Sequence, residues 1–116
     1  MTPDNFRRIA LSLPETIEKA HMSHPDFRVC GKIFATLGYP DQSLGMVKLT
    51  PEQQAAFVKA EPDAFVPVKG GWGLRGCTHV RLKKVKKPAL ERALLTAWRN
   101  TAPKNLPGPY EPERSK

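Results

Sequence analysis

Cysteine is scarce in this chain of 116 residues, and long apolar runs are missing. Two cysteines, Cys30 and Cys77, are too few for the disulfide framework of a small secreted domain. We therefore expect two buried thiols in a reducing compartment. No segment approaches the roughly 20 apolar residues of a membrane span, and the N-terminal residues lack the apolar run of a secretory signal. These absences favour a cytoplasmic protein.

The sequence also lacks the motifs of common active sites. No CxxC pair and no HExxH helix is present, so we expect no metal site; the candidate ligands are His21, His24, Cys30, Cys77 and His79. The glycine-rich segment 69–76 has neither the Gly-Lys-Ser/Thr ending of a phosphate-binding loop nor the GxGxxG spacing of a dinucleotide site. Cys77 and His79 could in principle form a thiolate nucleophile and its base, but no third catalytic group can be identified beside them. We expect neither an enzyme nor a cofactor.

Acidic residues are few in the second half of the chain. Residues 1–66 hold seven Lys/Arg against eight Asp/Glu, a sum of −1, whereas residues 67–116 hold twelve against three, a sum of +9. The positive field therefore arises from the second half, which favours a polyanionic partner. The composition is otherwise that of a globular protein, with 40% hydrophobic and 26% charged residues.

Local patterns predict one α+β domain over 1–102, with an antiparallel sheet of about five strands and three helices packed mainly on one face. The helices cover about 3–13 and 51–60 and the segment after Pro88, where Trp98 lies on the buried side. Thr2-Pro3 and Thr50-Pro51 supply an N-cap and a proline at the first helical position, and Gln53 completes a capping box. The predicted strands are 26–30, 33–37, 43–49 and 77–83, with weaker segments at 16–22 and 64–68.

Two connecting segments carry further predictions. Gly31-Lys32 suits a type II′ turn between the strands of the 26–37 hairpin. The segment 103–116 has four prolines in fourteen residues, which predicts an extended or disordered tail.

A basic surface is predicted around the strand 77–83. Alternation places Thr78, Val80 and Leu82 toward the core and His79, Arg81 and Lys83 in a row on the other face. Side chains two apart on a strand lie about 7 Å apart, comparable to successive phosphates of one nucleic-acid strand. The full set of candidate nucleic-acid contacts is Lys69, Trp72, Arg75, His79, Arg81, Lys83, Lys84, Lys86, Lys87, Arg92 and Arg99. The alternative is a solvated, solubilising charge run.

Trp72 lies between two glycines in the predicted loop 70–76. It suits a stacking platform for an unpaired base. A tryptophan at the end of a sheet also commonly closes the core, and we favour that interpretation.

Several phrases of the sequence resemble the MmcQ/YjbR family: FRVCGKIFATL at 27–37, Trp72-Gly73, THVRL at 78–82 and AWRNTAPK at 97–104. Together with the order of the predicted elements, the resemblance covers about 1–105. It implies a frataxin-like (CyaY-like) fold and a DNA-binding motif described as a double wing.

The sequence thus predicts a monomeric nucleic-acid-binding protein, with DNA as the expected partner, that contacts backbone phosphates and reads little sequence. The alternative is a protein-interaction module without catalysis, which engages an acidic partner through the basic face or the proline-rich tail.

Overall fold

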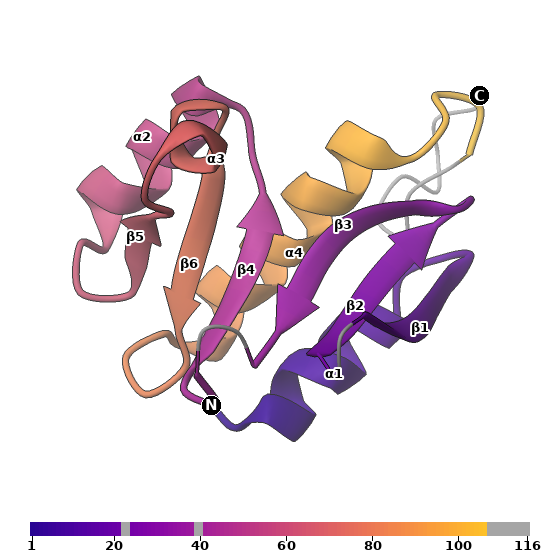
Figure 1. Ribbon diagram of the computed structural model, residues 1–116, viewed down its shortest axis with the longest axis horizontal. Coiled ribbons are helices and arrows are strands. Elements are labelled where there is room, and N and C mark those ends of the chain that lie inside the picture. The colour runs from indigo at the N-terminus through magenta and orange to yellow at the C-terminus, as the bar shows by residue number, and fades with distance from the viewer. Residues whose placement is uncertain (22–23, 39–40, 107–116) are drawn as a thin grey trace.

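A single six-stranded antiparallel sheet organises the computed structural model of the protein, which describes residues 1–21, 24–38 and 41–106 (Figure 1). Its strands are β1 (Thr16–His21), β2 (His24–Val29), β3 (Lys32–Leu37), β4 (Leu44–Lys48), β5 (Phe65–Pro67) and β6 (Cys77–Arg81). They lie in the order β1-β2-β3-β4-β6-β5. The helices are α1 (Pro3–Leu11), α2 (Pro51–Ala60), α3 (Gly71–Leu74) and α4 (Lys87–Thr101).

Three helices, α1, α2 and α4, cover one face of the sheet, and this confirms the predicted α+β class. Figure 1 shows α4 passing behind β3 and β4 with α1 beside it. The core between these layers holds Phe6 from α1, Phe27 from β2, Phe34 from β3 and Leu90 and Trp98 from α4. At the other end of the sheet, Phe57 of α2 contacts the ring of Phe65, with 5.0 Å between centroids. Among the described residues, no helix is long and apolar enough to cross a membrane.

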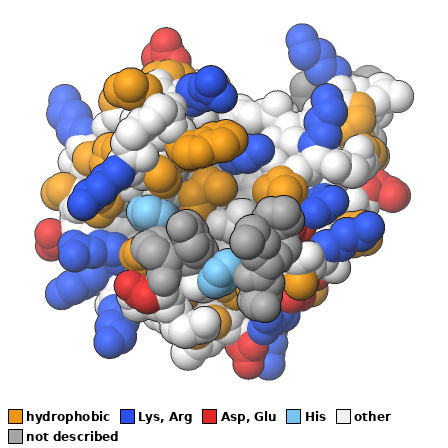
Figure 2. All heavy atoms as spheres, viewed as in Figure 1, with side chains coloured by type: hydrophobic (Ala, Val, Ile, Leu, Met, Phe, Trp, Pro, Cys, Tyr) orange, Lys and Arg blue, Asp and Glu red, His pale blue; other side chains and the backbone are white. Residues whose placement is uncertain are grey.

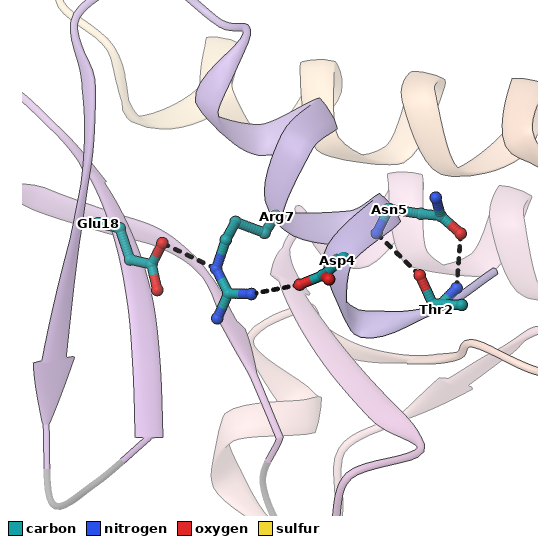
Figure 3. A network of polar contacts seen from close by, with 5 residues as sticks. All are labelled: Thr2, Asp4, Asn5, Arg7 and Glu18. Carbon is teal, nitrogen blue, oxygen red and sulfur yellow. Dashed lines mark hydrogen bonds and ion pairs between the residues drawn. The ribbon is translucent and has the colours of Figure 1, made fainter.

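The first two helices begin where the sequence predicts, because their caps are local. Thr50 accepts a hydrogen bond from the Gln53 amide and donates its own amide to the Gln53 side chain. Thr2 forms the same box with Asn5, as Figure 3 shows. Arg7 then bridges Asp4 at 2.8 Å and Glu18 of β1 at 2.9 Å, which ties α1 to the edge strand.

The hairpin turn between β2 and β3 lies one residue earlier than predicted. The loop residues are Cys30 and Gly31, with φ of 50° and 85°, instead of Gly31-Lys32. Two positive φ values are the signature of a type I′ turn, whose twist matches the flanking strands. The turn also exposes Cys30, so the prediction of a buried thiol is wrong for Cys30 and right for Cys77.

Other boundaries also differ from the prediction. The segment 70–76 contains the short helix α3, and β6 ends at Arg81, so Lys83 lies in a turn beyond the strand. Helix α4 starts at Lys87, with Pro88 inside its first turn. Of the predicted tail 103–116, residues 107–116 lie outside the described residues. Residues 103–106 form a turn, and Leu106 packs partly buried against the core.

Candidate functional site

Among the described residues, the face of the sheet opposite α1, α2 and α4 forms a concavity of about 790 Å³, which we name the sheet groove. Strand register builds its floor: His79 of β6 lies opposite both Met46 of β4 and Val66 of β5, and Met46 lies opposite Thr36 of β3. Leu44 and Ile33 extend the floor. Figure 2 shows hydrophobic side chains grouped on this face with Lys and Arg side chains around them.

Trp72 stands at the rim of the sheet groove with 60% of its surface exposed, so the favoured interpretation as a core residue is wrong. The guanidinium carbon of Arg75 lies 5.7 Å from the centroid of its ring, a cation–π contact. Leu74, next along α3, is 82% exposed. Two large apolar side chains on one short helix therefore face solvent.

Helix α3 is held firmly despite this exposure. Gln54 of α2 donates from its side-chain amide to the carbonyls of Gly73, at 3.1 Å, and Cys77, at 2.9 Å. Gly73 is buried so closely against the Val68 carbonyl that any Cβ at this position would collide with it. The fold thus presents Trp72 in a defined position.

One end of the sheet groove is cationic. Lys69 lines it after β5, and Lys48 lines it at the end of β4. Lys48 also borders two smaller concavities of about 490 and 300 Å³, the second of which it shares with Trp72 and Arg75. Sequence reasoning missed Lys48, because the first half of the chain carries no net positive charge. The alternation of Leu44, Met46 and Lys48 indicates that the three side chains share one face of a strand. Only the register of β4 against β6 shows that this face lines the groove.

The densest group of cations lies at the opposite end of β6. We name the segment 81–87 the basic loop; its exposed cations are Arg81, Lys83, Lys84, Lys86 and Lys87. Leu82 and Val85 are buried within it, and the amides of Lys84 and Val85 both donate to the Arg81 carbonyl at 3.0 Å. None of the four ion pairs found in the described part of the chain involves these cations. The two buried side chains therefore anchor the basic loop in the core, and its five cations are exposed to solvent.

The comparison with protein families identifies a relationship over most of this architecture. The family model YjbR matches residues 11–100, which include every strand and most of the helical layer. The chain belongs to the YjbR family. A comparison with curated proteins finds no match, and one with solved structures finds none either.

In this YjbR-family protein the predicted contact residues separate into three groups. Lys69, Trp72, Arg75 and His79 border or line the sheet groove and its neighbouring concavity. The basic loop holds the next five residues of the prediction. Arg92 and Arg99 belong to α4, on the other side of the sheet, and Arg92 lies 3.9 Å from Glu61. The structure thus does not bring these two arginines to the face that carries the groove.

Cys77 and His79 share a face of β6. Burial shifts the pKa of each side chain in the direction that opposes a thiolate–imidazolium ion pair. Burial raises the pKa of the Cys77 thiol, which Lys48 and Arg75 only partly counteract. Burial likewise lowers the pKa of His79, against the opposing effect of Asp41. Both groups are therefore held neutral near pH 7. Within the described residues, no group of three or more His, Cys, Asp or Glu side chains is placed to hold a metal ion.

Proposed function

We propose that this YjbR-family protein binds DNA through backbone phosphates, with the basic loop as the main contact surface. The observation that supports it is the cluster of five exposed cations within residues 81–87. Phosphate contact requires positive groups and little base recognition, so the expected binding depends strongly on salt and weakly on sequence.

Residues at the far end of β6 extend the proposed contact. Cys77 and Arg81 are four residues apart, so they lie roughly 14 Å from each other along β6. Lys69 and Arg75 lie beyond the Cys77 end of the strand, and the basic loop begins at its Arg81 end. A nucleic-acid strand that follows β6 could meet both groups and pass Trp72 at the rim. Arg92 and Arg99 do not belong to this surface.

The test is fluorescence-anisotropy titration of duplex and single-stranded DNA between about 50 and 200 mM salt. Five phosphate contacts predict a slope of about −4.5 in log affinity against log salt, and therefore a roughly 500-fold loss of affinity over this range. The variant Lys83→Gln/Lys84→Gln/Lys86→Gln removes three contacts. Its slope should fall to about −1.8, with an affinity loss of about 12-fold over the same range.

A matched control separates the basic loop from net charge. Lys19→Gln/Lys59→Gln/Lys104→Gln removes the same three charges from exposed positions on β1, on α2 and after α4. The slope of log affinity against log salt for this control should differ from that of the parent by no more than about 0.9, the value of one phosphate contact. Equal slopes for the two triple variants would show that the loop is no specific surface.

A second candidate, docking of an acidic protein partner, is favoured by the exposure of Trp72 and Leu74 beside Arg75. Tryptophan and arginine carry much of the binding energy at protein interfaces. This interaction would depend on salt less steeply than phosphate binding does. Failure of the chain to bind DNA even at low salt would leave it as the better proposal.

A further inference from the structure

The sheet groove has the size and composition of a small-molecule site. Its volume of about 790 Å³ lies within the range of roughly 300–1,000 Å³ typical of ligand pockets. The floor is apolar over Leu44, Met46 and Val66, and the Trp72 ring stands at its rim. Val66 and Trp72 are exposed here, so apolar surface remains on this face for a ligand to cover.

The lysine side chains that line the sheet groove, Lys48 and Lys69, lie at one end of it, whereas Arg81 of the basic loop lies opposite Leu44 at the other end. Leu44, Met46 and Lys48 follow one another at alternate positions of β4, so an apolar track along the strand leads to an ammonium group. Lys69 lines the same concavity. Among the described residues, no Asp or Glu side chain lines it. Neither lysine takes part in the ion pairs of that part of the chain. Charge complementarity therefore calls for an anion at this end.

The geometry points to a binding site for a small amphipathic carboxylate, with the carboxylate between Lys48 and Lys69 and the apolar tail along Met46 and Leu44. From Lys48 to Leu44 the strand spans roughly 14 Å, which accommodates a medium-length acyl chain. The ammonium groups supply charge-assisted hydrogen bonds, and the floor supplies apolar contact. A phosphodiester strand matches this floor poorly, because it offers charge at every repeat. The site shares Lys69 and Trp72 with the extended part of the proposed DNA contact, but it shares no residue with the basic loop, which is the main surface of that proposal.

The experiment titrates decanoate, below its micelle concentration, into the isotopically labelled protein and follows backbone amide shifts. Saturable shifts should appear in 44–48, 66–69 and 77–79. Decanol and decyltrimethylammonium carry the same tail without the negative charge. We expect decanol to bind about tenfold more weakly than decanoate, which corresponds to one lost charge-assisted contact, and the cationic probe more weakly still.

Two variants and one control locate the site. Lys48→Gln should weaken decanoate binding about tenfold and leave decanol unchanged. Met46→Asp should abolish binding of both probes; because it alters the floor, its amide spectrum first establishes that it folds. Lys84→Gln, in the basic loop, should bind decanoate like the parent while its DNA affinity falls, so the two proposals succeed or fail separately.

The inference is overturned by unchanged decanoate affinity in Lys48→Gln, by equal affinity for decanoate and decanol, or by shifts that map outside the sheet groove. Concentration-dependent dimerisation with shifts in the same residues, before any probe is added, would also overturn it. The groove would then be covered by a second copy of the chain.

Discussion

Replacing Gly73 by alanine tests how the fold presents Trp72 at the sheet groove. A Cβ at this position would lie much nearer the Val68 carbonyl oxygen than the 3.0 Å that Cβ atoms keep, and the obstacle is backbone, which cannot rotate away. Helix α3 must therefore move, and the 3.1 Å hydrogen bond from Gln54 to the Gly73 carbonyl is lost with it. The hydrogen bond contributes about 1 kcal/mol and the forced repacking costs about 1–3 kcal/mol.

Gly71→Ala is the matched control, two residues earlier in the same helix. Nothing lies within 4 Å of a Cβ there, so alanine should be neutral or stabilise by up to about 1 kcal/mol. The measurement is urea denaturation of both variants, in which Gly73→Ala should lose about 2–4 kcal/mol of unfolding free energy relative to the parent. Stabilities of the two variants that agree within about 0.5 kcal/mol would refute the reasoning.

Two further predictions concern the cap of α2 and the floor of the sheet groove. Thr50→Ala removes the 3.2 Å hydrogen bond from the Gln53 amide and should cost about 1 kcal/mol in urea denaturation; no loss would show that the cap is dispensable. Burial lowers the pKa of His79 below 6.5, with Asp41 opposing, so the unfolded chain takes up the proton first as pH falls. The free energy of unfolding should therefore decrease between about pH 7.5 and 5.5, and less so in His79→Gln; an identical pH dependence of the two proteins would contradict this.

The helices and the burial pattern of β6 could be predicted because they depend on residues close in sequence. A capping box joins residues three apart, and Thr50 and Gln53 suffice to start α2. Alternation placed Val80 and Leu82 in the core, where the structure has them. The hairpin turn was misplaced because Gly31 suits either of two adjacent two-residue turns, and strand twist chose between them.

Local patterns in the sequence were enough to predict the α+β class, the main helices, the uneven charge and the run of cations at 81–87. The three-dimensional fold was needed to show that Trp72 faces solvent and that Lys48 and Lys69 line the same end of one groove. Trp72 is exposed because Gly73 packs on Val68 and Gln54 holds α3 in place. Lys48 and Lys69 line the same end of the groove because β4 and β5 pair with the two sides of β6. Such proximity depends on strand register between distant segments, which local patterns do not encode.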